Sequence, residues 1–77
     1  MRLAINARSF VMKIQLNGEE HEVAPCQTVL EFLQQLQLPL EVLLVEHNGD
    51  ALRREDWAQR LMHEDDRLEV IRIVAGG

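Results

Sequence analysis

The stretch Lys13–Val23 reads KIQLNGEEHEV and predicts the hairpin around which the rest of the fold is assembled. Its first four residues alternate polar and apolar side chains, as a strand with one buried face does. Asn17-Gly18 then supplies two residues that adopt positive φ, which a type I′ turn requires at both central positions. Residues 19–23 form the returning strand, and Pro25 ends the pairing because proline has no backbone N–H.

A helix is predicted directly after the hairpin. Thr28 and Glu31 have the spacing of a capping box, in which each side chain accepts a hydrogen bond from the other residue's backbone N–H. Apolar residues then recur at helical spacing and form one stripe that would pack against a sheet. They are Val29, Phe32, Leu33 and Leu36. Pro39 stops the helix shortly after Gln37.

Two further strands are predicted after the helix. Residues 42–47 are nearly all apolar, which indicates an interior strand. Asn48-Gly49 repeats the turn signal, and Ala51-Leu52 has room only for a short strand. Trp57 is expected in a short helical turn, where its large ring would close the open end of the core.

A polar turn at residues 63–66 leads into the last strand, residues 67–74, which reads RLEVIRIV. The predicted order is therefore hairpin, helix, strand, short strand and final strand. The compact arrangement that fits this order and length is an α+β fold, the β-grasp, in which a mixed sheet clasps one main helix. The first and last strands are expected to lie side by side at the centre of the sheet.

The period of two assigns the faces of the last strand. Leu68 and Val70 are predicted to face the helix, whereas Ile71 and Ile73 face outward and form an exposed apolar patch. The sequence then runs through Val74, Ala75, Gly76 and Gly77. Two glycines add nothing to packing and lose much backbone entropy on ordering, but a slim tail can thread into a narrow partner site. This pattern predicts a carrier whose terminal carboxylate is activated by a partner.

The composition restricts the classes of protein to which the chain can belong. With 77 residues, 47% of them hydrophobic, it is predicted to form one small globular domain. Thirteen acids oppose eight bases, and neither Lys nor Arg occurs between Ile14 and Leu52. Such a surface repels phosphate backbones and anionic lipids, so neither nucleic acid nor membrane is expected as a partner. The acids are interpreted either as a surface for a basic protein partner or as ordinary solvated charge.

The start of the chain is predicted to differ from the rest. Residues 1–11 carry two arginines and no acids, so they are interpreted as a flexible N-terminal extension, with the domain proper at residues 12–77. A single cysteine, Cys26, cannot form an internal disulfide, and neither a signal peptide nor a long apolar run is recognisable. The predicted location is the cytoplasm.

Metal and nucleophilic chemistry receive little support from the spacing of residues. His21, His47 and His63 are scattered, and no His-x-x-x-His or Cys-x-x-Cys pattern occurs, so no metal site is predicted. The three histidines are interpreted as solvated surface. Cys26 has no local partner motif, and its simplest role is a small residue at the helix entrance. A persulfide on Cys26 is the alternative.

Residues 12–77 resemble the ThiS family, the small sulfur carriers of thiamine thiazole synthesis. The similar pieces are the hairpin at Met12–Glu19, the helix start at Gln27–Leu33, the Arg54-x-x-Trp57 segment, and the last strand and tail at residues 66–77. Two positions depart from the family pattern. Cys26 stands where the family often has glycine, and Asp65 stands where a glycine-aspartate turn is usual; aspartate tolerates the left-handed conformation that glycine favours there.

The resemblance implies a ubiquitin-like β-grasp fold and a carrier protein rather than an enzyme. It implies that a ThiF-like adenylating enzyme uses ATP and Mg²⁺ to activate Gly77, while the chain itself binds no cofactor. Sulfur from a cysteine desulfurase then displaces AMP, and thiazole synthase (ThiG) takes it from the Gly77 thiocarboxylate. Gly76, which has no side chain, allows the tail to enter the partner's site. The expected partner contacts are Ile71, Ile73, Val74 and Ala75.

Three alternatives share the same features. A similar tail occurs in MoaD, the small subunit of molybdopterin synthase, although chains like it tend to approach the tail through a proline that residues 73–75 lack. A ubiquitin-like modifier would be joined to lysines of other proteins instead of carrying sulfur. A plain β-grasp interaction domain would bind its partner equally well without Gly76 and Gly77.

Overall fold

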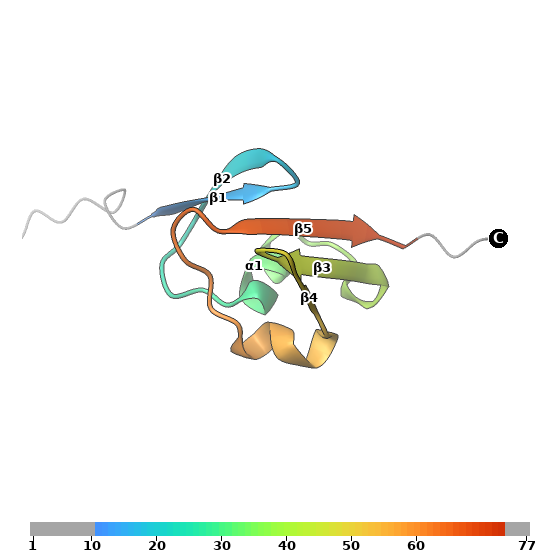
Figure 1. Cartoon of the computed structure of the whole chain (residues 1–77). Coiled ribbons are helices and arrows are strands. Elements are labelled where there is room, and N and C mark those ends of the chain that lie inside the picture. Colours follow the sequence, from blue (N-terminus) through green and yellow to red (C-terminus); the bar gives the residue numbers. More distant parts are fainter. Residues whose placement is uncertain (1–10, 74–77) are drawn as a thin grey trace, which may run out of the picture.

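The computed structural model of the chain describes residues 11–73, and its elements follow the predicted order (Figure 1). The strands are β1 (Met12–Leu16), β2 (Glu19–Val23), β3 (Leu43–His47), β4 (Asp50–Leu52) and β5 (Arg67–Arg72). The helices are α1 (Val29–Gln35) and two 3₁₀ helices, η2 (Leu40–Val42) and η3 (Arg54–Gln59). The predicted N-terminal extension lies outside the described residues except for Val11. Within residues 11–73, no helix is long and apolar enough to cross a membrane.

The strands form one mixed sheet in the order β2-β1-β5-β3-β4. β1 pairs antiparallel with β2 and parallel with β5, while β3 pairs antiparallel with both β5 and β4. The first and last strands are therefore neighbours, and β5 is the central strand, as predicted. α1 lies against one face of the sheet (Figure 1), and its residues Val29, Phe32 and Leu33 are buried in the core, which confirms the α+β β-grasp arrangement.

Both Asn-Gly turns have the backbone conformation that the sequence predicts. Asn17 and Gly18 have φ values of 51° and 86°, and Asn48 and Gly49 have 52° and 89°. Positive φ at both central residues matches the right-handed twist of the flanking strands. These two turns set the β1–β2 and β3–β4 registers.

The helix begins at the predicted capping box. The Glu31 N–H donates to Thr28 Oγ1 at 3.1 Å, and the Thr28 N–H donates to Glu31 Oε1 at 2.9 Å. Each bond satisfies a backbone donor that the first turn of a helix otherwise leaves unpaired.

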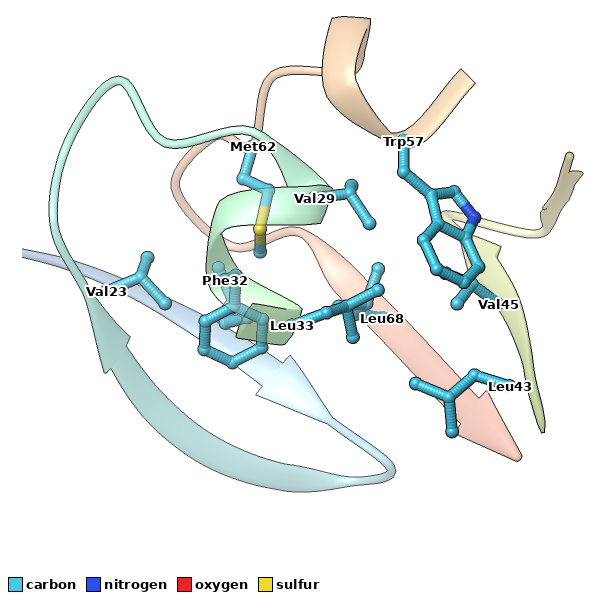
Figure 2. Close-up of a cluster of buried hydrophobic side chains, with 10 residues drawn as sticks. Val23, Val29, Phe32, Leu33, Leu43, Val45, Trp57, Met62 and Leu68 are labelled. Carbon is cyan, nitrogen blue, oxygen red and sulfur yellow. The ribbon is translucent and has the colours of Figure 1, made fainter. Parts of the chain in front are cut away.

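One hydrophobic core lies between the sheet, α1 and η3 (Figure 2). Its buried members are Ile14, Val23, Val29, Phe32, Leu33, Leu43, Val45, Trp57, Met62 and Leu68. Trp57 is only 1% exposed, which confirms that it closes the core. In Figure 2, Trp57 and Val45 lie at one end of this cluster, and Phe32 and Val23 lie toward the other.

The strand predicted at residues 42–47 begins one residue later than expected. Val42 ends η2, because its N–H donates to the Pro39 carbonyl and closes a 3₁₀ turn. Its carbonyl still accepts a hydrogen bond from the Ile73 N–H at 2.7 Å. Val42 therefore continues the β3–β5 ladder without being in strand conformation.

The two departures from the ThiS family pattern share one backbone feature. Cys26 has a φ of 64° and Asp65 a φ of 67°. This left-handed region suits glycine and costs other residues roughly 1–2 kcal/mol. The chain thus keeps a conformation compatible with glycine at both positions, and the prediction that Asp65 tolerates it is confirmed.

Substitution of Leu68 tests the central position of β5. Leu68 is 0% exposed, so Leu68→Ala is expected to lower the free energy of unfolding by about 2–5 kcal/mol, through lost burial and the cavity left behind. Leu44→Ala is the matched control, since Leu44 is 55% exposed, and its effect should stay within about 0.5 kcal/mol. Urea denaturation measures both; equal losses would contradict this account of the core.

Candidate functional site

The outer face of the sheet carries an exposed apolar patch beside the end of β5. Ile71 and Ile73 are 58% and 46% exposed, whereas Leu68 is buried and Val70 half-buried on the opposite face. This confirms the predicted division of β5 into an inner and an outer face. Leu44 of β3 lies directly opposite Ile71 and completes what we call the outer patch: Leu44, Ile71 and Ile73.

The sequence did not single out Leu44 as an exposed residue. Residues 42–47 are so uniformly apolar that they indicated an interior strand without distinguishing its two faces. In the structure burial alternates along β3, so that Leu43, Val45 and His47 face the core and Leu44 and Glu46 face outward. The signal available in the sequence was Glu46, because a charged residue among apolar ones marks the open face.

Backbone pairing holds β5 nearly to the end of the described residues. On the β3 side, the Ile73 N–H donates to the Val42 carbonyl. On the other side, β1 pairs only as far as Leu68, and the Asn17 side chain takes over beyond it. Asn17 Nδ2 donates to the Val70 carbonyl at 3.1 Å, and the Val70 N–H donates to Asn17 Oδ1 at 2.8 Å. The Asn17 side-chain amide thereby makes the two hydrogen bonds to Val70 that a further residue of β1 would otherwise make.

Asn48 clamps the start of β5 in a similar way. Its Oδ1 accepts from the Arg67 N–H at 2.8 Å, and its Nδ2 donates to Asp66 Oδ1 at 3.0 Å. The two Asn-Gly turns therefore do more than reverse the chain. Their asparagine side chains fix β5 from both sides, and so they position the residues that precede the tail.

The predicted tail site lies outside the described residues. It consists of Val74, Ala75, Gly76 and Gly77. Of the six predicted site residues, the structure describes only Ile71 and Ile73, and both lie on the outer face of the sheet.

The prediction that all three histidines are solvated is wrong for His47. His63 is exposed and His21 is half-buried, edge-on to the Phe32 ring, but His47 is only 4% exposed. The physical reason is the period of two in β3, which places His47 on the same face as Leu43 and Val45. An inward polar residue at the end of a strand needs hydrogen-bonding partners, and the polar turn before β5 supplies one.

His47 is held between an acid and an arginine. Its Nε2 lies 2.6 Å from Asp66 Oδ2, and the Arg60 Nε–H donates to His47 Nδ1 at 3.0 Å. A guanidinium N–H can only donate, so Nδ1 must be the acceptor and Nε2 carries the proton that is donated to Asp66. Both ring nitrogens are occupied. His47 therefore joins β3 to the start of β5 and offers no free nitrogen for acid–base work or metal binding.

Asp66 is the buried centre of this network. Burial raises its pKa, but hydrogen bonds from Asn48, His47 and the His63 backbone N–H together outweigh burial and hold the pKa below its ordinary value. Donors aimed at a carboxylate stabilise its charged form, which produces this direction of shift. Asp66 is thus an anchoring carboxylate that links the turn at residues 63–66 to the β3–β4 turn.

Other chemistry has little basis in the described part of the chain. No group of three or more His, Cys, Asp or Glu residues within residues 11–73 could hold a metal ion. Cys26 is exposed at the entrance to α1, at the position that the sequence predicted. The remaining candidate is the outer patch and the strand end from which the tail departs.

This combination of a β-grasp and an apolar outer face beside the end of the last strand defines a ubiquitin-like domain. The chain belongs to the ThiS family, whose model matches residues 14–77. It is 32% identical over 66 residues to the Escherichia coli protein named sulfur carrier protein ThiS, which covers 86% of this chain and all of that protein.

A solved structure supports the same assignment. The crystal structure of the thiamine biosynthesis protein ThiS from Geobacter metallireducens matches with a TM-score of 0.76 and 30% identity, covering 86% of this chain and all of that one. Two proteins named thiazole synthase, from Magnetococcus marinus and Paramagnetospirillum magneticum, are 35% and 30% identical over 66 residues. The chain spans about a fifth of their length, 20% in each case.

The Asp66 network predicts how stability depends on pH. Because the folded pKa of Asp66 lies below its unfolded value, its contribution is fully present above the unfolded pKa and is lost as the pH falls through the folded pKa. We expect Asp66→Asn to cost about 1–3 kcal/mol at pH 7, since it leaves a buried donor without its acceptor, and to flatten the acid limb of the stability curve.

Thermal melts between pH 7 and pH 2 measure this difference. Asp65→Asn is the control, because Asp65 is an exposed neighbour and asparagine also tolerates its positive φ. An acid limb equally steep in wild type and Asp66→Asn would show that other carboxylates govern acid unfolding.

Proposed function

We propose that the chain is a sulfur carrier of thiamine thiazole synthesis, which accepts sulfur at the Gly77 carboxylate and delivers it to thiazole synthase. The observation that carries this proposal is the match along the whole length of the Escherichia coli sulfur carrier protein ThiS. In this role the chain is a substrate of its partner enzymes and not an enzyme itself. The fold serves to present a tail and a docking face together.

The chemistry follows from the weakness of a carboxylate as an electrophile. Its charge repels nucleophiles, and oxide is a very poor leaving group. Attack of a Gly77 oxygen on the α-phosphorus of ATP, with loss of pyrophosphate, gives an acyl adenylate that corrects both faults. A persulfide sulfur then displaces AMP, and a second thiol cleaves the S–S bond to leave the thiocarboxylate. ATP and Mg²⁺ belong to the adenylating enzyme, and the chain contributes the carboxylate.

The geometry of β5 suits this role. A reactive end needs a firmly held strand behind it, and the hydrogen bond from the Ile73 N–H to β3's neighbour Val42 supplies that support. The residues that follow, 74–77, end in two glycines, which can pass through a narrow channel because they lack a Cβ. Ile71 and Ile73 are proposed to contact the partner surface around that channel, and Val74 and Ala75 its entrance.

Three partners are proposed: a ThiF-like adenylating enzyme, thiazole synthase (ThiG), and a cysteine desulfurase as the indirect source of sulfur. A stretch similar to this chain within two proteins named thiazole synthase supports the second of these. Placing a carrier and its acceptor in one polypeptide raises their effective concentration, which is useful only when the two work together. The reactions are proposed to occur in the cytoplasm, where ATP is supplied.

Intact mass spectrometry tests the sulfur chemistry directly. Incubation with ATP, the adenylating enzyme and a persulfide donor is expected to replace one oxygen of the chain by sulfur, localised to the peptide that ends at Gly77. A variant extended beyond Gly77 should remain unmodified because its terminal carboxylate is elsewhere. Modification of the untrimmed extended variant would contradict the mechanism, and lysine-linked adducts would instead indicate a protein modifier.

Truncation of Ile73 tests the docking role of the outer patch. Ile73→Ala is expected to raise the KM of the adenylating enzyme for the chain about tenfold, because a buried interface contact is lost, with kcat little changed. Leu61→Ala is the matched control, since Leu61 is 47% exposed against 46% for Ile73 but lies outside the sheet. Equal effects on KM would assign no special role to the outer patch.

A further inference from the structure

Two glutamates occupy facing positions on the outer face of the sheet. Glu46 of β3 is directly opposite Glu69 of β5 in the antiparallel register, and both side chains are exposed. Like charges directly opposite each other destabilise a strand pair. Here the pair occupies the central strand and its neighbour, so the repulsion falls in the middle of the sheet and not at an edge.

No ion pair within the described residues involves either glutamate. Some other acids do have basic partners: Asp50 lies 2.9 Å from Arg60, and Glu20 lies 3.8 Å from Lys13. Within residues 11–73, neither Glu46 nor Glu69 forms an ion pair or a side-chain hydrogen bond. Arg67, two residues before Glu69 on the same exposed face of β5, forms no ion pair with it, so the free domain keeps two like charges at facing positions without a direct partner for either.

The carboxylate pair adjoins the outer patch around a shallow hollow. Its lining includes Leu44 and Ile71 as well as Glu46 and Glu69, with Ala51 of β4 beside them. The volume is about 160 Å³, well below the roughly 300–1,000 Å³ typical of small-molecule sites. A hollow of this size suits the end of a single side chain from a partner protein.

Arginine has the chemistry that this lining requires. Its aliphatic stem can lie along Leu44 and Ile71, while its planar guanidinium presents several donors that can bridge two carboxylates. Lysine offers a compact and strongly hydrated charge that suits two acceptors less well. A second copy of this chain fits poorly, because a symmetric contact would bring two acidic pairs together on molecules of net charge −5.

We propose that Glu46 and Glu69 form a receptor for an arginine side chain of the protein that docks on the outer patch. This inference rests on the proposed function, since it takes the adenylating enzyme as that protein. Binding exchanges the repulsion between two carboxylates for charge-assisted hydrogen bonds, so the acidic pair favours the complex over the free chain.

Calorimetric titration into the ThiF-like adenylating enzyme, without ATP, measures docking separately from chemistry at Gly77. Glu46→Gln and Glu69→Gln are each expected to raise Kd about tenfold or more, and Glu46→Lys further still. Raising the salt concentration should weaken wild-type binding more than binding of the double glutamine variant. Glu55→Gln is the control: Glu55 is an exposed acid on η3, away from the outer face, and Kd should stay within about twofold.

Thermal melts of the free variants separate docking from a structural role. Relief of repulsion is expected to raise the Tm of either glutamine variant by about 1–5 °C at low salt. Glu46→Lys should also raise Tm, since the lysine would face Glu69. A structural role would lower stability and binding together, so a fall in Tm overturns the proposal.

The binding outcomes also distinguish this proposal from the proposed function. Unchanged Kd in both glutamine variants overturns the arginine receptor, whether or not sulfur is loaded. Binding with the expected dependence on Glu46 and Glu69, but without the mass change at Gly77, contradicts only the sulfur chemistry. A wild-type chain that does not bind the adenylating enzyme contradicts both.

Discussion

The pairing of β5 with β1 on one side and β3 on the other is the constraint on which the rest of the structure depends. β5 is the last strand in the chain but the central strand of the sheet. Its register with β3 places Leu68 in the core and Ile71 beside Leu44 on the outer face. A slip of one residue would exchange these faces and destroy the core and the outer patch together.

Side chains from distant turns reinforce that register. Asn17 and Asn48 hydrogen-bond the backbone of β5 from opposite sides, and Asp66 joins the start of β5 to His47. Of these groups only Asp66 and His47 are buried, and each would be costly to bury without its partner. Together these hydrogen bonds fix the backbone of β5 although much of its outer face is exposed.

The outer face has features that do not serve the free domain. Exposed Leu44, Ile71 and Ile73 gain little burial in the isolated chain, and the pair Glu46–Glu69 opposes it. Features that break local rules without a structural gain are expected at functional sites. The edge strand β2 shows the contrasting case, where Glu19, Glu20 and Glu22 on a short strand discourage edge-to-edge association.

Local chemistry was sufficient to predict the five strands, the main helix and the helical turn at Trp57, whereas η2 was not predicted. Asn17-Gly18 and Asn48-Gly49 specify turns because few other dipeptides adopt positive φ twice, and Thr28 with Glu31 specifies a helix start. The alternation along β5 likewise placed Ile71 and Ile73 outside. Each of these signals lies within a few consecutive residues, so it can be recognised in the sequence without knowing which distant residues are in contact.

Only the tertiary structure decided what depends on register between strands. The contact of His47 with Asp66 and the meeting of Glu46 with Glu69 both follow from how β3 lies against the segment that leads into β5, about twenty positions away in the chain. No local pattern records such a pairing, because the energy that selects it comes from the shared core and is spread over many side chains. The sequence by itself determined which segments become strands and helix, while long-range packing determined which of their faces meet.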